Sequence, residues 1–206
     1  MIIGLGTGRC GSMSLSHLLN AQTGCGCTHE MTYDFKKFIV QPLDINNPEM
    51  ADIYLDNINS RTLPIKADIS LWWLNFVDQI VDKYKDDVKF ICLRRDKEQT
   101  VNSYVKKMNI NGTNGMNHVQ DHDGSFYAKN PWDASYPNFE ADSLPEALGL
   151  YWEDYYKRSE EFTKKYPNQF KLVDMLDLND KDKVLDLLNF CEIPNPNVVI
   201  KQSNKG

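Results

Sequence analysis

No other part of the sequence narrows the choice of fold as much as its first 20 residues, MIIGLGTGRCGSMSLSHLLN. A short apolar run at residues 2–5 leads into a glycine-rich loop, GTGRCGSMS at residues 6–14, and leucines at helical spacing follow. This order predicts a strand, a tight loop and a helix. Such a loop presents backbone N–H groups and the positive end of the helix to an anion, which favours phosphate binding.

The loop lacks the pair of residues that nucleoside triphosphatases need. Those enzymes have Lys and then Ser or Thr after the second conserved glycine, which hold the terminal phosphates and Mg²⁺. Here Ser12 and Met13 follow Gly11, and Arg9 is the cation that the loop offers. The combination predicts a ligand with a terminal phosphate or phosphosulfate that is bound without a metal ion. A glycine-rich turn of an unrelated α/β protein is the alternative interpretation.

Strands and helices alternate through most of the chain. We expect strands within residues 24–31, 60–70, 88–93 and 170–178, and helices at 12–20, 71–85, 97–108, 145–165 and 181–193. The near-continuous apolar run VKFICL at 88–93 is typical of a parallel strand covered on both faces. The alternation predicts an α/β fold with a central parallel sheet flanked by helices, in which ligands bind at the carboxyl ends of the strands.

Size and composition suit one domain over residues 1–206, with 41% hydrophobic and 25% charged residues. Residues 109–145 interrupt the alternation with many Asn, Gly, Asp and Pro residues, and aromatic residues such as Trp132 lie among them. A connection of this length predicts a substrate lid or a mobile loop.

The net charge of −6 argues against nucleic acid or an anionic membrane surface as a partner. No segment reaches the roughly 18 consecutive apolar residues of a spanning helix, so we expect a soluble, cytoplasmic protein. Cys25 and Cys27 are spaced more tightly than zinc ligands usually are, and we expect no metal. The sequence does not indicate an oligomeric state.

A second motif, VKFICLRRDKEQTVNSY, resembles the 3′-phosphate-binding segment of sulfotransferases that use 3′-phosphoadenosine-5′-phosphosulfate (PAPS). That segment has a strand, an arginine, and a serine eight residues later on the next helix, and the matching pair here is Arg95 and Ser103. Arg94 fits this spacing less well. A guanidinium at a strand end and a hydroxyl two helical turns further on can both reach one phosphate.

The first loop then resembles the 5′-phosphosulfate loop of the same family. Arg9 takes the basic position, and the turn that follows is made of Cys10, Gly11, Ser12, Met13 and Ser14. The resemblance implies the sulfotransferase variant of the P-loop nucleoside-triphosphatase-like fold, with PAPS as donor, adenosine 3′,5′-bisphosphate as product and no metal. In the family, a basic loop near the end of the chain also holds the 3′-phosphate, and residues 204–206 would make only a minimal version of it.

A third match concerns the base. The segment PIKADISLWW resembles the place where cytosolic sulfotransferases have a lysine, a small residue and a base. The resemblance implies Asp68 as the base, with Lys66 and Arg9 stabilising the transferring group and the leaving phosphate. Asp68 or Ser70 could instead cap the helix that follows, and Lys66 could be a solvated strand residue.

The sequence leaves other candidates and other functions open. His29, after the second expected strand, is an alternative base, an acceptor contact or a structural histidine. The helix at 145–165 is mostly core packing, although Trp152, like Trp132 in the expected lid, is a candidate contact for a small-molecule or carbohydrate acceptor. A small-molecule kinase would need the missing lysine, and a protein that binds adenosine bisphosphate without catalysis is a further alternative.

Overall fold

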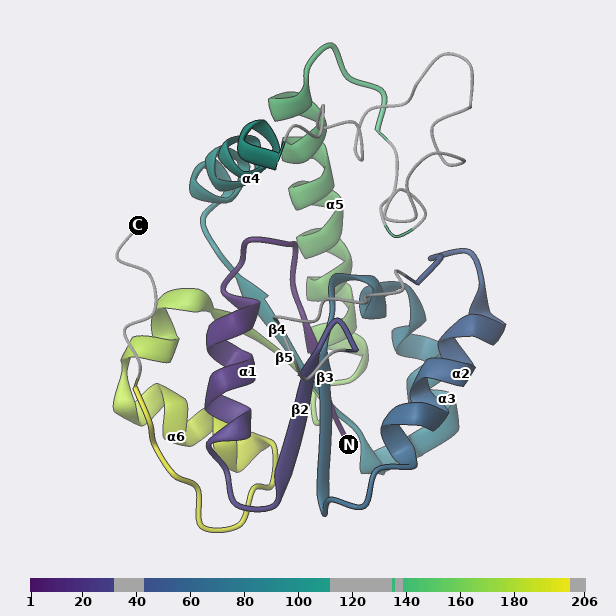
Figure 1. The fold of residues 1–206 in the computed structure, drawn as a ribbon, viewed down its shortest axis with the longest axis vertical. Coiled ribbons are helices and arrows are strands. Elements are labelled where there is room, and N and C mark those ends of the chain that lie inside the picture. The colour runs from purple at the N-terminus through teal and green to yellow at the C-terminus, as the bar shows by residue number, and fades with distance from the viewer. Residues whose placement is uncertain (32–42, 112–134, 136–138, 201–206) are drawn as a thin grey trace.

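The computed structural model describes residues 1–31, 43–111, 135 and 139–200. Within these ranges, all the strands form one sheet in the order β2-β3-β1-β4-β5, and every neighbouring pair is parallel (Figure 1). The strands are β1 (Ile2–Leu5), β2 (Cys25–His29), β3 (Ile65–Ile69), β4 (Lys89–Arg94) and β5 (Phe170–Asp174). This confirms the predicted single-domain α/β fold with a central parallel sheet.

Helices cover both faces of the sheet (Figure 1). On one face lie α1 (Ser12–Asn20) and α6 (Lys181–Phe190), and on the other lie α2 (Pro48–Asn59), α3 (Val77–Tyr84) and α5 (Leu144–Lys165). Because side chains alternate along a strand, Ile2 packs in the cluster with α1 and α6, whereas Ile3 packs in the cluster with the other three helices. Helix α4 (Lys97–Asn111) continues from β4 and packs beside α5 beyond the carboxyl edge of the sheet.

Side-chain caps start α2 and α5. The side chain of Asn47 accepts a hydrogen bond from Met50 N before α2, and that of Ser143 accepts one from Glu146 N before α5. In both helices a proline occupies the first turn, where its missing N–H costs nothing.

The expected helix at 71–85 is two elements. Residues Leu71–Phe76 form a 3₁₀ helix, η1, and α3 begins only at Val77. Five of the six residues of η1 are buried, including Trp72 and Trp73. An amphipathic helix buries one stripe of its surface, whereas a helical segment that is apolar on all sides lies inside the core, as η1 does.

The predicted lid at 109–145 lies largely outside the described residues, and so do Trp132 and residues 204–206. Its two ends belong to helices, because α4 extends to Asn111 and α5 begins at Leu144. Among the helices that the structure describes, none has the length and apolarity to cross a membrane.

Candidate active site

The glycine-rich loop lies at the carboxyl end of β1, the central strand, and leads directly into α1. Gly6 and Gly11 have φ angles of 146° and 98°, which residues with a side chain rarely adopt. A Cβ atom on Gly8 would lie 1.8 Å from the hydroxyl of Tyr104 on α4. Gly11 is the N-cap of α1 and has no side chain to cap it, so the first turn of the helix offers its N–H groups to an anion.

Two tyrosines of α5 hold the start of this loop. The Tyr155 hydroxyl accepts from Gly6 N at 2.9 Å and donates to the Leu71 carbonyl at 3.0 Å. The Tyr156 hydroxyl donates to the Leu93 carbonyl at 2.7 Å and lies 3.2 Å from Thr7 Oγ1. Burial raises the pKa of both phenols well above the ordinary value, so both act as neutral hydrogen-bonding groups.

The structure brings Arg9, Arg95 and Ser103 together from three elements. Arg9 Nε donates to Ser103 Oγ at 3.1 Å, and Arg95 Nη1 donates to the Arg9 carbonyl at 3.2 Å. Arg94 points elsewhere and forms an ion pair with Glu160 of α5 at 3.2 Å. The residues that the two sequence motifs selected therefore form one cluster beside the N-terminus of α1, with Arg95 rather than Arg94 facing the loop.

The remaining loop residues and Trp152 lie around this cluster. Cys10 is fully buried, and burial raises the pKa of its thiol to about 12, so it is neutral. Ser12, Met13 and Ser14 are half-buried in the first turn of α1. The Trp152 indole N–H donates to the Arg95 carbonyl at 2.9 Å, so the contacts of Trp152 are to the arginine side of the site.

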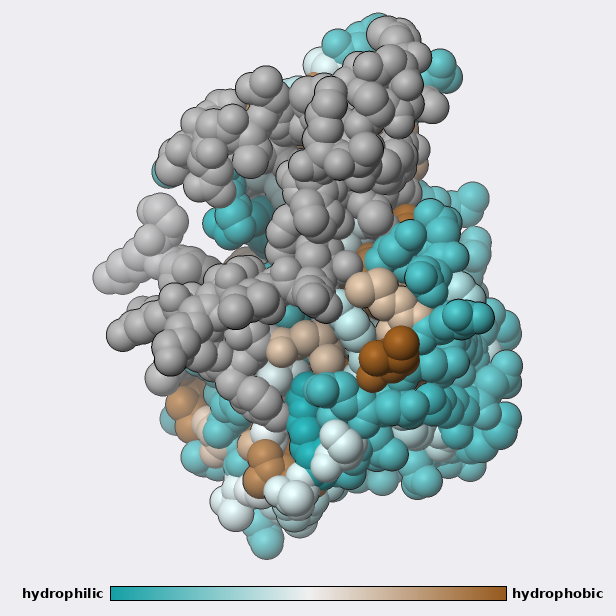
Figure 2. Space-filling view, turned by 45° about the vertical axis from the view of Figure 1, so that its right-hand side comes forward, coloured by the Kyte–Doolittle hydropathy of each residue, from teal (hydrophilic) through white to brown (hydrophobic). Residues whose placement is uncertain are grey.

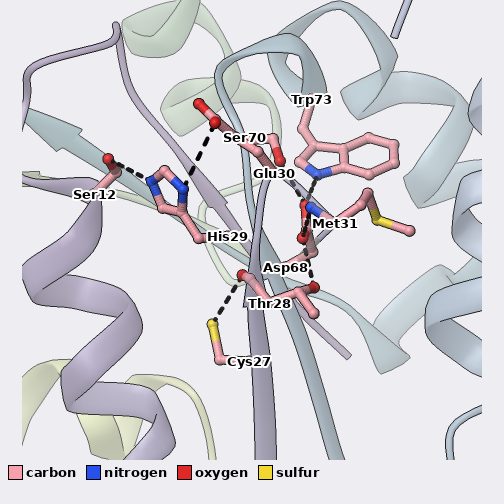
Figure 3. A network of polar contacts seen from close by, with 9 residues as sticks. All are labelled: Ser12, Cys27, Thr28, His29, Glu30, Met31, Asp68, Ser70 and Trp73. Atoms are coloured by element: carbon pink, nitrogen blue, oxygen red, sulfur yellow. Dashed lines mark hydrogen bonds and ion pairs between the residues drawn. The ribbon is translucent and has the colours of Figure 1, made fainter. Parts of the chain in front are cut away.

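Asp68 lies near the end of β3 as expected, but it is enclosed (Figure 3). Its Oδ1 accepts from Thr28 Oγ1 at 2.6 Å and Met31 N at 2.9 Å, and its Oδ2 accepts from Ser70 Oγ at 2.6 Å and Trp73 Nε1 at 2.7 Å. The side chain is fully buried. A base must reach the proton that it removes, so this geometry favours a structural role for Asp68 over the predicted role as base.

The direction of the strand explains why Asp68 does not face the loop. Asp68 pairs with Ile3, and both side chains point to the face that α2, α3 and α5 cover. Ser70 does not cap η1, because its hydroxyl donates to Asp68 and no side-chain cap is present there.

Lys66 is not brought to the loop. It lies in the amino-terminal half of β3, and its Nζ donates to the carbonyl of Asn59 at 2.5 Å, close to the C-terminus of α2. The loop lies at the opposite, carboxyl edge of the sheet. The described contacts of Lys66 therefore correspond to the alternative interpretation, a partly solvated strand residue.

His29 does reach the loop. It pairs with Ile69, whose side chain faces α1, and His29 Nε2 lies 2.8 Å from Ser12 Oγ in the first turn of α1 (Figure 3). Its Nδ1 lies 3.8 Å from Glu30 Oε2. Burial lowers the pKa of His29 and raises that of Glu30 to about 7, because both charged forms are poorly solvated here. The sequence interpretation included His29 but missed Glu30, whose position next to His29 at a strand end was the available signal.

The comparisons with known proteins find similarity among solved structures. No protein-family model matches the chain, and a search of curated proteins finds no match. Among solved structures, the crystal structure of a sulfotransferase from Alicyclobacillus acidocaldarius matches with a TM-score of 0.60 and 14% sequence identity, over 98% of this chain and 85% of that chain.

This chain has a sulfotransferase-like fold. At 14% identity the likeness concerns the fold and assigns no donor or acceptor. Within this sulfotransferase-like fold, the loop after β1 and the cluster of Arg9, Arg95 and Ser103 lie together at the carboxyl edge of the sheet. The residues that the structure describes contain no group of three His, Cys, Asp or Glu side chains placed to hold a metal ion.

Proposed function

We propose that this protein is a sulfotransferase that transfers a sulfuryl group from PAPS to a hydroxyl or amine of a small-molecule or carbohydrate acceptor. The observation that carries the proposal is the cluster of Arg9, Arg95 and Ser103 beside the N-terminus of α1, which no side chain caps. Two guanidinium groups, a hydroxyl and helix N–H groups form a donor set suited to the two phosphates of PAPS. The sulfotransferase-like fold supports the same function.

In this proposal each part of the cluster binds one end of the donor. Arg95, which directly follows β4, and Ser103 on α4 bind the 3′-phosphate. Arg9 and the turn Cys10–Ser14 bind the 5′-phosphosulfate. Cys10 and Met13 contribute backbone N–H groups only, whereas Ser12 and Ser14 add hydroxyl donors.

His29 is the proposed base in place of Asp68. PAPS supplies an activated sulfuryl group: the acceptor atom forms a bond to sulfur while the bond from sulfur to the phosphate oxygen breaks. Burial keeps His29 neutral near pH 7, so its Nε2 can take the acceptor proton beside Ser12. Glu30 lies 3.8 Å from Nδ1 and stabilises the imidazolium that results, while Arg9 stabilises the charge on the leaving phosphate.

A transfer assay tests the function. Purified protein is incubated with ³⁵S-labelled PAPS, EDTA and pools of acceptors that contain phenols, alcohols, amines or carbohydrates. We expect labelled product from at least one pool. In His29→Gln the transfer rate falls by roughly 10²-fold, while the affinity for adenosine 3′,5′-bisphosphate changes little.

Three outcomes of this assay would contradict the proposal. Binding of the bisphosphate without transfer to any pool would favour a non-catalytic binding protein. Phosphoryl transfer from ATP in a parallel incubation, with Mg²⁺ in place of EDTA, would favour a kinase. Equal transfer by the wild-type protein and His29→Gln would remove His29 as the base.

A further inference from the structure

The turn after β2 has an unusual backbone. Glu30 and Met31 have φ angles of 52° and 63°, so two consecutive residues with side chains adopt the left-handed conformation. This conformation is disfavoured for residues other than glycine, and it persists where surrounding contacts hold it. The turn carries Glu30 and directly follows His29, so its shape determines the geometry of the proposed base.

Asp68 supplies the contact that fixes this turn. Glu30 N first continues the sheet by donating to the Ile69 carbonyl at 2.9 Å, and Met31 N then donates to Asp68 Oδ1 at 2.9 Å. The other donors to the carboxylate come from Thr28 on β2, and from Ser70 and Trp73 beyond β3 (Figure 3). A carboxylate held from both strands is a rigid acceptor for the Met31 N–H.

We propose that Asp68 is a positioning residue that fixes the Glu30–Met31 turn and so holds the His29–Glu30 pair against the loop. With the turn in place, His29 Nε2 lies 2.8 Å from Ser12 Oγ, and Nδ1 lies 3.8 Å from Glu30 Oε2. Asp68 itself exchanges no proton with the acceptor. This inference rests on the proposed function of His29.

The hydrogen-bond pattern suggests a variant that removes the charge of Asp68 and keeps the turn. An asparagine has one acceptor oxygen and one N–H₂ group. The hydroxyls of Thr28 and Ser70 can rotate to accept a hydrogen bond from that N–H₂ group. The N–H groups of Met31 and Trp73 are donors only, so each needs an acceptor oxygen. In Asp68→Asn/Trp73→Phe the indole donor is gone, so the amide oxygen can face Met31. Trp73→Phe alone is the matched control, and Asp68→Ala removes the acceptor altogether.

The first readout needs no activity: NMR titration of the His29 ring in the ligand-free protein, assigned with His29→Gln. The negative charge of Asp68 raises the pKa of His29, whereas the positive charges of Lys107 and His17 lower it. Glu30 lies beside the His29 ring. Loss of the Asp68 charge alone therefore lowers the His29 pKa further. Release of the turn hydrates the ring and raises the pKa toward its ordinary value.

Positioning predicts opposite shifts in the two variants. In Asp68→Ala the pKa of His29 rises although a negative charge has been removed, whereas in Asp68→Asn/Trp73→Phe it stays at or below the value for Trp73→Phe. A fall in both variants would show that Asp68 acts on His29 through charge alone and would overturn the inference. The outcome is independent of whether the protein transfers sulfuryl groups.

The second readout is the transfer rate with the acceptor pool that the assay above identifies. We expect Asp68→Asn/Trp73→Phe to stay within about threefold of Trp73→Phe and Asp68→Ala to lose more than tenfold. Equal, large losses in both variants would reinstate Asp68 as the base.

A measurement on the wild-type protein covers the case in which these variants do not fold. Hydrogen exchange of the Met31 amide is expected to be as slow as that of the amides in β2. Exchange at the rate of an unprotected chain would overturn the inference.

Discussion

His29 and Glu30 are adjacent, and burial shifts their pKa values in opposite directions. Burial disfavours the charged form of each group, which is the protonated histidine and the deprotonated glutamate. The positive charge of Lys107 opposes the shift of Glu30 and adds to that of His29. The result is a neutral imidazole and a carboxyl group that titrates near neutrality, side by side at the edge of the sheet.

Glu30 makes the stability of the fold depend on pH. Its pKa rises from 4.5 in the unfolded chain to about 7 in the folded protein. The folded protein therefore holds this proton more tightly, and the associated stability is fully present below pH 4.5 and is lost as pH rises through about 7. The shift corresponds to roughly 3 kcal/mol. Relative to Glu30→Gln, the wild-type protein should lose stability over this range.

Urea denaturation at several pH values between 4 and 8 measures this difference. Glu30→Gln retains the side-chain volume and lacks the titration, so it is the matched variant. Free energies of unfolding that run parallel for the two proteins would show that Glu30 is solvated in the folded state.

At the scale of elements, α5 acts as the support of the loop through Tyr155 and Tyr156. Both residues are buried, as expected for a helix that serves mostly in core packing. Their hydroxyls have a second role, because they form hydrogen bonds with backbone groups of the loop and of the neighbouring strand ends. The helix thus couples the core to the proposed donor site.

Tyr155→Phe tests this coupling. The change leaves two buried backbone groups, Gly6 N–H and the Leu71 carbonyl, without their partner. We expect a loss of about 2 kcal/mol in the free energy of unfolding and weaker binding of adenosine 3′,5′-bisphosphate.

Tyr166→Phe, at the C-cap of α5, is the control, because it removes an exposed hydrogen bond to Asp78. It should cost about 0.5 kcal/mol and leave binding unchanged. Equal effects of the two substitutions in denaturation and calorimetry would mean that Tyr155 does not support the loop.

The local elements were the most predictable part of the fold. Helix α1 begins at Ser12 as the glycine loop predicts, and β4 coincides with the apolar run at 88–93 within one residue. Helix α2 was not predicted, although its buried residues Ala51, Leu55 and Ile58 have helical spacing in the sequence. The periodicity of residues 71–84 did not show their division into η1 and α3, nor the tertiary contact in which the Trp73 indole of η1 donates to Asp68.

The positions of Arg9, Arg95 and His29 beside the loop were predictable, because each lies close in sequence to the end of a strand, and their roles stay predictions. The site was not predictable where the face of a strand decides. Asp68 and Lys66 are two residues apart on β3 and share one face, but only the register with β1 shows that this face is opposite to α1. The segment KAD therefore resembles the family's motif in sequence, but in this chain the side chains of Lys66 and Asp68 point away from the loop.

At the scale of the whole molecule, an acidic chain keeps its proposed anion site basic through local placement. The net charge is −6, yet Arg9 and Arg95 meet at the carboxyl edge of the central strand β1 and its neighbour β4. The adjacent arginine, Arg94, is bound to Glu160 on the other side of the strand. The central claim is that this edge binds the two phosphates of PAPS.

Calorimetric titration with adenosine 3′,5′-bisphosphate in EDTA tests this claim most directly, with Arg95→Ala beside Arg94→Ala. Both variants lose one positive charge, and they differ in the direction of the side chain. We expect 1:1 binding by the wild-type protein and by Arg94→Ala. In Arg95→Ala the affinity should be lower by roughly 10- to 100-fold, as for a lost charge-assisted hydrogen bond. No binding by the wild-type protein, or equal losses in the two variants, would contradict the account.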